Sequence, residues 1–158
     1  MKLADTTLVA TLTAPGCSEK SGMLPTTARS WWSMIYSGSN SGLLGKSAGI
    51  PGSLGVAGNH NGVLIGLTGH ASGGSLQSQL LAETAAHEMG HFLGLYHPTE
   101  SAGTLFDPIS DTPECTVGSI TAEECESYGG GNVMFWTAYN TSSRNSGKKQ
   151  ERLCPDQV

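Results

Sequence analysis

The stretch QLLAETAAHEMGHFLGLYH, residues 79–97, decides the fold and the chemistry to be expected of this chain. Residues 80–93 are mostly strong helix formers without proline, which predicts a helix. Apolar residues recur in it at steps of four and three, at Leu81, Ala85, Met89 and Phe92. Ser75 or Ser78, after a pair of glycines, can cap its start. Gly94 can take the positive φ that ends the helix and turns the chain.

Three histidines in this stretch have the spacing of a metal site. His87 and His91 lie one helical turn apart, so both imidazoles can reach one ion from a rigid support. His97 follows the turn at Gly94 and can supply a third nitrogen. Three imidazoles with one position left open are typical of catalytic zinc, because structural zinc sites usually close with four ligands rich in cysteine. Glu88 is placed to accept a proton from water rather than to bind the metal.

The pattern H-E-x-x-H-x-x-G-x-x-H resembles the metzincin clan of zinc peptidases, to which these residues match at every fixed position. The clan also carries a methionine-containing turn under the metal, and Asn132-Val133-Met134, after three glycines, is the candidate here. The -GLYH- ending, this N-x-M turn and Asp111-Thr112-Pro113 look most like the pappalysins within the clan. The resemblance covers roughly residues 50–137.

The resemblance implies an α+β, zincin-like fold, with a twisted mixed sheet over the active-site helix and a loop-rich lower half that contains the Met turn. Residues 1–158 then form a single catalytic domain, with an upper half of about 1–94, a lower half of about 95–158 and the zinc cleft between them. In metzincins the strand before the zinc helix borders the cleft and pairs with an extended substrate. The resemblance assigns that role here to the strand predicted at Gly62, Val63, Leu64, Ile65 and Gly66. The alternative is that this strand only packs in the core.

The remaining elements are predicted from local patterns. Helical turns are expected at 121–126 and 142–153, and 37–59 is interpreted as a long irregular loop. His60 and His70, in glycine-rich turns, are expected to be exposed. The long backing helix that metzincins normally carry is not apparent in the first thirty residues. Further strand candidates are 6–12, 54–57 and 31–37, the last of which could also form part of a short helix.

Composition narrows the classes of partner. A length of 158 residues suits one domain, and a net charge of -5 without any basic run argues against nucleic acid or anionic membrane as partners. No segment approaches the ~18 apolar residues of a transmembrane helix. Asp5 interrupts any signal-peptide core, so we interpret the chain as a mature domain that has lost its targeting segment. We expect a monomer.

The four cysteines lack C-x-x-C spacing, which favours disulfides over a cysteine zinc site, and their even number suits an oxidising compartment. Three pairings are possible. The favoured one joins Cys115 to Cys125 across a short loop and Cys17 to Cys154 near the chain ends. The alternative is that Cys17 acts as an inhibitory thiolate on the zinc, as amino-terminal segments do in some metzincin zymogens.

Two further sets of residues are candidates for binding. Among the loop acids that follow the histidines, Asp107 and Asp111 could ligate calcium, which related enzymes carry here, although no regular calcium-loop spacing appears and solvated acids are the alternative. The other acids of this loop are Glu100 and Glu114. Residues just after the Met turn, with 137–139 as the nearest candidates, should wall the pocket beside the zinc. There, the tyrosine of astacins and pappalysins is replaced by Trp136, which cannot ligate zinc, and the nearest phenol is Tyr139.

These patterns predict a secreted zinc endopeptidase that hydrolyses peptide bonds of extended polypeptides, with Glu88 as general base. One alternative is a latent or inactive zincin-fold binding module, whose open metal position is filled by the glycine-rich loop or by Cys17. The other is a zincin that acts on a small amide.

Overall fold

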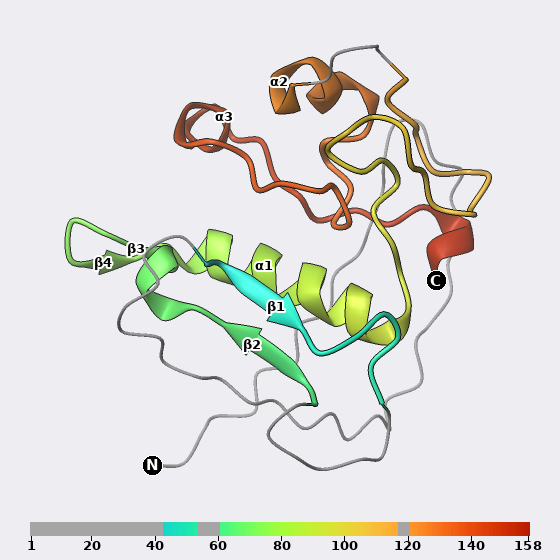
Figure 1. Cartoon of the computed structure of the whole chain (residues 1–158). Helices are drawn as coiled ribbons and strands as arrows, with labels where there is room; N and C mark the ends of the chain where they lie inside the picture. The colour runs from blue at the N-terminus through green and yellow to red at the C-terminus, as the bar shows by residue number, and fades with distance from the viewer. Residues whose placement is uncertain (1–42, 54–60, 117–120) are drawn as a thin grey trace.

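Helix α1, Ser78–Leu93, is the central element of the computed structural model, which describes residues 43–53, 61–116 and 121–158. On one side of α1 lies a two-stranded antiparallel sheet of β1 (Gly45–Ser47) and β2 (Val63–Ile65). The segment that follows α1 occupies the other side, as Figure 1 shows. The helix therefore separates a strand-bearing half from a loop-built half, in an α+β arrangement.

The two ends of α1 are fixed differently. The helix begins two residues earlier than predicted, and the expectation of a serine cap was wrong. Gln77 is the N-cap residue and makes no side-chain cap bond, while Ser75 belongs to a strand. Instead, the backbone N–H of Gln77 donates to the carbonyl of His70 at 2.7 Å. Gly94 ends the helix as predicted, with φ 108°. Its backbone N–H donates to carbonyl oxygens of the last turn.

The buried face of α1 is largely polar. The predicted apolar stripe of Leu81, Ala85, Met89 and Phe92 is only half-buried. Polar groups inside a protein need hydrogen-bond partners, so the contacts of this face are a guide to function. Its buried residues are Leu80, Glu83, Thr84, Glu88, Gly90 and His91.

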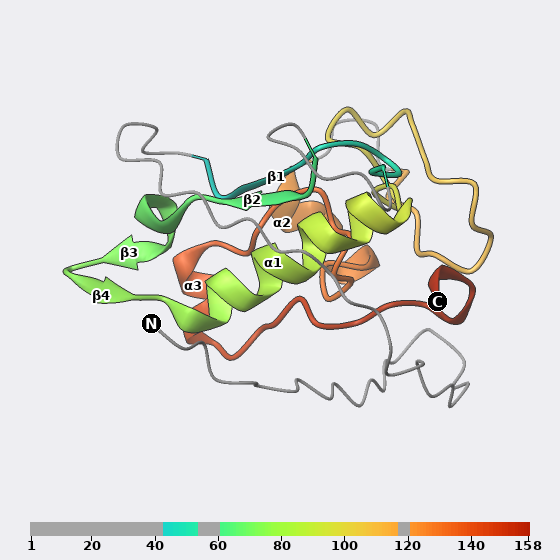
Figure 2. The same cartoon turned by 90° about the horizontal axis from the view of Figure 1, so that it is seen from below.

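The strand-bearing half is only partly as predicted. Strand β2 was expected, with Val63 and Ile65 buried, but the chain turns at Leu67 into the 3-10 helix η1 (Leu67–His70). Strand β1 lies in a stretch interpreted as irregular. Its sequence, Gly-Lys-Ser, has little β propensity, so its pairing with β2 and its packing on α1 must determine its conformation. Between η1 and α1, the hairpin of β3 (Ala71–Ser72) and β4 (Ser75–Leu76) extends beyond the start of the helix (Figure 2).

The expectation that His70 is exposed was wrong, because η1 carries its ring underneath α1, where it is 0% exposed. Its Nδ1 lies 2.8 Å from the carbonyl oxygen of Gly66, and its Nε2 lies 2.9 Å from Oγ1 of Thr84. The imidazole thus ties the end of the strand segment to the helix. His60 lies outside the described residues, as do the strand candidates 6–12, 31–37 and 54–57, so the mixed sheet stays a prediction.

The second half contains short helices joined by loops. The predicted turn at 121–126 is confirmed as α2 (Ala122–Cys125) followed by η2 (Glu126–Tyr128), and Thr121 and Glu124 form the capping box at its start. The predicted final helix is shorter than expected. It is α3 (Thr141–Asn145), after which Gly147, with φ 84°, redirects the chain to run beside Gly131. The last element is η3, Pro155–Gln157.

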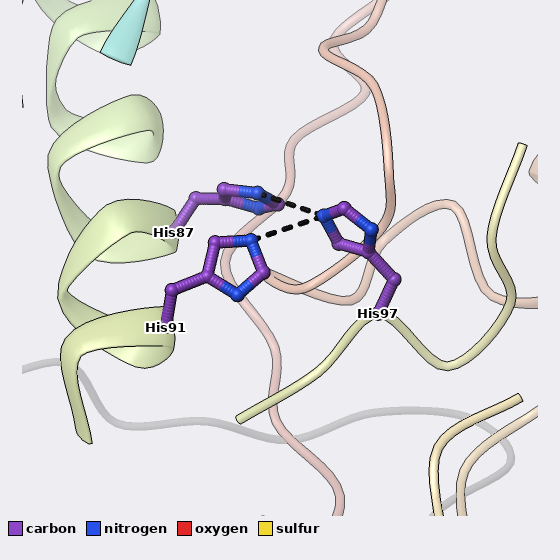
Figure 3. Close-up of side chains that lie close together, drawn as sticks. All are labelled: His87, His91 and His97. Carbon is purple, nitrogen blue, oxygen red and sulfur yellow. Dashed lines mark hydrogen bonds between the residues drawn. The ribbon is translucent and has the colours of Figure 1, made fainter. Parts of the chain in front are cut away.

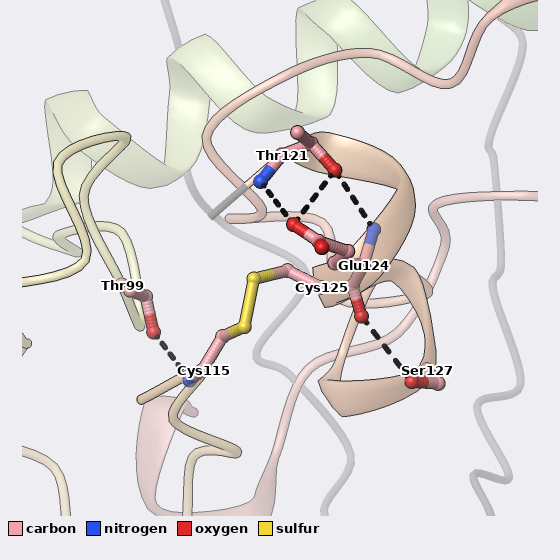
Figure 4. Close-up of a disulfide and its surroundings, with 6 residues drawn as sticks. All are labelled: Thr99, Cys115, Thr121, Glu124, Cys125 and Ser127. Atoms are coloured by element: carbon pink, nitrogen blue, oxygen red, sulfur yellow. Dashed lines mark hydrogen bonds between the residues drawn. A yellow bond between two sulfur atoms is a disulfide. The ribbon is translucent and has the colours of Figure 1, made fainter. Parts of the chain in front are cut away.

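A disulfide joins Cys115 to Cys125, as predicted, with the two Cα atoms 5.6 Å apart (Figure 4). It is buried against Phe135, and Trp136 packs on this cluster. Cys154 is also disulfide-bonded. Its predicted partner, Cys17, lies outside the described residues, and that pairing remains a prediction.

No helix in the described part of the chain combines the length and apolar character required to cross a membrane.

Candidate metal centre and adjoining pocket

The three histidines of the motif converge on one point. His87 and His91 project from α1 and His97 from the loop after it (Figure 3). The Nε2 atom of His97 lies 3.1 Å from Nε2 of His91 and 3.2 Å from Nε2 of His87. Within the described residues, no other group of three or more His, Cys, Asp or Glu side chains is arranged to hold a metal ion.

Each ring is oriented by a hydrogen bond at its other nitrogen. Nδ1 of His87 lies 2.7 Å from the carbonyl oxygen of Val133, and Nδ1 of His91 lies 2.8 Å from the carbonyl oxygen of Leu95. His97 is oriented by a side chain. Its Nδ1 is 3.0 Å from the carboxylate oxygen Oε2 of Glu100. A carbonyl or ionised carboxylate oxygen only accepts, so each Nδ1 carries a proton and Nε2 is directed to the shared point.

The donor set fits a metal cation such as zinc. Burial lowers the pKa of His87 to about 4, against the opposing hydrogen bond from its ring to Val133, and burial also lowers the pKa of His91. Both rings are therefore neutral at pH 7, and their Nε2 lone pairs face the same point. A tetrahedral zinc ion with Zn–N bonds of about 2.0–2.1 Å holds its nitrogens about 3.3–3.4 Å apart. The nitrogen separations of 3.1 and 3.2 Å are close to that spacing.

Glu88 is buried beside the triad, with 8% of its surface exposed. Burial raises the pKa of its carboxyl group to about 7, and a hydrogen bond from the backbone N–H of Ser47 opposes that shift. Strand β1 lies close against the side chain, because a Cβ added at Gly45 would be 2.6 Å from Cγ of Glu88. The carboxylate is thus held between helix and strand, and its pKa lies in the range that suits proton transfer near neutral pH.

Met134 lies under the helix, with 0% of its surface exposed. Its backbone N–H donates to Oδ1 of Asn132 at 2.8 Å, which closes a tight turn. A Cβ added at Gly90 would lie 2.3 Å from the sulfur of Met134. The glycine within the histidine motif therefore lets the helix and this turn approach closely. Val133, in the same turn, supplies the oxygen that orients His87.

A pocket of about 250 Å³ adjoins His87 and Glu88. The segment after Met134 supplies one wall of this pocket, and Gly45 of β1 borders it, whereas residues 62–66 do not. Trp136 lines the pocket together with Thr137 and Ala138, and its ring centroid is 4.2 Å from that of Phe135. The apolar lining residues are Leu44, Leu80, Val133, Phe135, Trp136 and Ala138.

Tyr139 does not line this pocket and is 8% exposed. A Cβ added at Gly130 would lie 2.8 Å from its hydroxyl oxygen, so the phenol is packed into the second half of the chain. Burial, and then the nearby charge of Glu126, raise the pKa of Tyr139 to about 12. The hydroxyl therefore keeps its proton throughout the physiological range.

Comparison with known proteins supports a peptidase. A stretch of 56 residues is 48% identical to an extracellular metalloprotease of Colletotrichum graminicola and covers 34% of this chain and 20% of that protein. The chain is thus similar to a metalloprotease. It spans about a fifth of the length of this relative, and no protein-family model and no solved structure matches it. The likeness and the histidine triad together support a metal-dependent peptidase in general terms.

The calcium candidates lie together in the loop after His97. Asp107 is buried, and its Oδ1 accepts hydrogen bonds from the side chain of Thr112 at 2.6 Å and from the backbone N–H of Ile109 at 3.3 Å. Oδ2 of Asp107 and Oδ1 of Asp111 are buried without a hydrogen-bond partner. Burial raises the pKa of Asp107, and the neighbouring charge of Asp111 adds to that shift. Glu100 is directed to His97 instead.

Sequence reasoning missed the polar end of the pocket. Glu83 and Gln150 line it, although they are 67 residues apart in the chain. Glu83 precedes His87 by one helical turn, so the helical period could have placed it on the same face. No local pattern indicates that Gln150 or Arg144, the ion-pair partner of Glu83, would meet it.

Proposed function

We propose that this chain is a catalytic domain of a secreted zinc metalloendopeptidase of the metzincin type, most similar in pattern to the pappalysins. The observation that carries the proposal is the convergence of three Nε2 atoms beside a pocket that His87 and Glu88 line. The relative is named as an extracellular protein, which is in keeping with the disulfide of this chain.

The proposed zinc ligands are His87, His91 and His97, and the fourth position is open to water and substrate. When bound there, zinc would polarise the scissile carbonyl and lower the pKa of water towards neutrality. The hydrogen bonds at Nδ1 keep each Nε2 free to bind and its ring fixed in direction. We assign the turn at Met134 as the Met turn, because it is packed against the helix segment between the ligands.

Glu88 is the proposed general base. Its carboxylate accepts the proton of the attacking water and then donates it to the amine that leaves, so that one group serves both steps. The hydrogen bond from Ser47 and the close approach of Gly45 fix the side chain, which lowers the cost of ordering it. Burial of the carboxylate strengthens its affinity for the proton in the step in which it acts as a base.

We propose that the oxyanion is stabilised without a protein phenol. Trp136 lines the pocket where the resembled families carry a tyrosine, and an indole N–H can donate one hydrogen bond but cannot ligate zinc. Tyr139 is packed away from the pocket. The metal and whichever donors line the cleft must then provide the stabilisation that a tyrosine hydroxyl supplies elsewhere.

The proposed substrate is a polypeptide that lies extended across the cleft between the two halves of a single domain. Strand β1 is the described strand that borders the pocket, so the substrate would run beside Gly45 rather than beside Gly62 to Gly66 of the β2 segment. The β2 segment, which the sequence favoured, is the untested alternative. A monomer is sufficient for this arrangement, because both walls of the pocket come from one chain.

Metal analysis combined with a quenched-peptide assay tests the proposal. We expect about one zinc ion per chain, peptide cleavage that a chelator abolishes, and recovery of cleavage on adding zinc. Cleavage that is indifferent to the chelator contradicts a zinc peptidase. Zinc binding without cleavage of any peptide or of casein supports the alternative of a binding module. Activity on small amides alone supports the alternative of a zincin that acts on a small amide.

We further propose that Asp107 and Asp111 hold a calcium ion. Each residue has a buried carboxylate oxygen without a hydrogen-bond partner, and the charge of Asp111 raises the pKa of Asp107. Burying such charges is costly unless a cation neutralises them. Calcium should raise the thermal midpoint of the zinc-loaded protein, and the rise should disappear in Asp107→Asn. An unchanged midpoint in wild type contradicts a calcium site.

A further inference from the structure

One of the pocket's lining residues, Glu83, belongs to a buried ion pair. Glu83 lines the pocket and is 6% exposed. Its Oε2 accepts from Nη1 of Arg144 at 2.5 Å, and its Oε1 accepts from Nε2 of Gln79 at 2.8 Å and from the backbone N–H of Gln150 at 3.2 Å. The carboxylate therefore has a full-charge partner and two neutral donors.

Arg144 reaches Glu83 from behind the pocket wall. It belongs to α3 and is not among the residues that line the pocket, and 13% of its side chain is exposed. Its Nε donates to the carbonyl oxygen of Tyr139 at 2.9 Å, which fixes the guanidinium in place. The pocket thus has an acid in its lining, but that acid is neutralised by a cation that a bound side chain does not touch.

The same network holds the wall that follows Met134. Gln150 donates from Nε2 to the carbonyl oxygen of Thr137 at 2.7 Å, and its Oε1 accepts from the backbone N–H of Tyr139 at 3.1 Å. Arg144 binds the carbonyl of the same Tyr139. The wall is therefore fastened to Glu83 of α1 at two places, which gives the pocket a fixed width.

We propose that Arg144 sets the specificity of this pocket by cancelling the charge of Glu83, so that the pocket selects a large apolar side chain next to the scissile bond. This inference rests on the proposed peptidase function. A substrate lysine or arginine would lose its water to meet an acid that is already paired, and that loss would go uncompensated. A substrate acid would likewise lose its water without gaining a cationic partner, and it would lie near the carboxylate of Glu88. An apolar side chain would meet the leucine, valine and aromatic residues of the walls.

The experiment is cleavage profiling of a peptide library by the zinc-loaded protein, with each position beside the scissile bond read separately. Wild type should favour large apolar residues over lysine, arginine, aspartate and glutamate at one of these positions. A wild type that favours lysine or arginine there overturns the proposal by itself, whatever the variants do.

Charge-matched variants then test the pair. Arg144→Gln keeps a hydrogen-bond donor near Glu83 but removes the cation, so the unpaired carboxylate should raise the kcat/KM of lysine and arginine peptides relative to leucine peptides by at least tenfold. Arg144→Lys restores the cation and should keep the wild-type preference. The double variant Glu83→Gln/Arg144→Gln removes both charges and should also keep it.

Zinc content and circular dichroism of each variant establish that it is folded. An Arg144→Gln protein that is folded, holds zinc and keeps the wild-type preference overturns the proposal, because the unpaired charge of Glu83 would then have no influence on the bound side chain. If Arg144→Gln does not fold, the wild-type profile and the double variant decide. An apolar preference in both supports the proposal, and a double variant that favours lysine or arginine overturns it. A wild type that binds zinc and cleaves nothing refutes the proposed function instead.

Discussion

Replacement of Gly90 by alanine tests how closely α1 lies on the turn at Met134. By helix propensity alone, the change should stabilise the protein, since alanine in a helix interior is favoured over glycine by about 0.8–1.0 kcal/mol. In this fold, however, the new Cβ would lie 2.3 Å from the sulfur of Met134 and 3.2 Å from its terminal methyl carbon. Met134 is 0% exposed, so protein atoms surround its side chain and must shift if it moves.

Overpacking of a buried site costs about 1–3 kcal/mol, which exceeds the gain in propensity. Gly90→Ala should therefore lower the free energy of unfolding by about 1 kcal/mol on balance. The matched background is Met134→Ala, which removes the sulfur and leaves space for the new methyl group. In that background, Gly90→Ala should be neutral or stabilising, and the coupling between the two sites should be about 1–3 kcal/mol.

Urea denaturation of the four proteins of this cycle, with the disulfides intact, gives the coupling directly. Stabilisation by Gly90→Ala of about 1 kcal/mol in both backgrounds would refute the reasoning, since propensity alone would then account for the result. That result would also mean that Met134 is not packed against the helix segment that carries the histidines, and it would remove the support for a Met turn.

Three further predictions concern the surroundings of the site. Glu100→Ala should weaken zinc binding about 10–100-fold in chelator competition, because His97 loses its only hydrogen bond to a carboxylate in the described structure. Glu100→Gln should weaken it less, and a zinc affinity of Glu100→Ala equal to that of wild type would contradict this. Tyr139→Phe should lower kcat less than tenfold, and a hundredfold loss with zinc still bound would show that the phenol reaches the reaction. Replacing both Cys115 and Cys125 by serine should lower the free energy of unfolding by about 2–3 kcal/mol in denaturant titration, and an unchanged value would mean that the link does not constrain the unfolded chain.

The histidine motif could be predicted from sequence because all its information is local. His87 and His91 are related by the helical period, and Gly94 provides the one backbone conformation that returns the chain towards His97. The Cys115–Cys125 link and the capping box at Thr121 are similarly short-range features. In each case a few neighbouring residues specify the geometry.

The features that sequence did not predict depend on distant segments. Strand β1 forms from Gly-Lys-Ser because β2 and α1 are beside it, and His70 is buried because η1 turns under the helix. The Glu83–Arg144 pair joins α1 to α3 across 61 residues, and nothing near either residue indicates the other. Apolar periodicity was also a poor guide to the buried face of α1, because that face carries the polar groups of the site.

The most direct test of the account is hydrolysis of a quenched peptide by wild type and by Glu88→Gln at equal zinc content. Glutamine is similar in size to glutamate but cannot accept the proton of water, and His87, His91 and His97 are unchanged. We predict about one zinc ion in each protein, chelator-sensitive cleavage by wild type and no measurable turnover by Glu88→Gln. Equal cleavage by the two zinc-loaded proteins would contradict the account, because the peptidase chemistry would not then depend on the buried carboxylate beside the histidines.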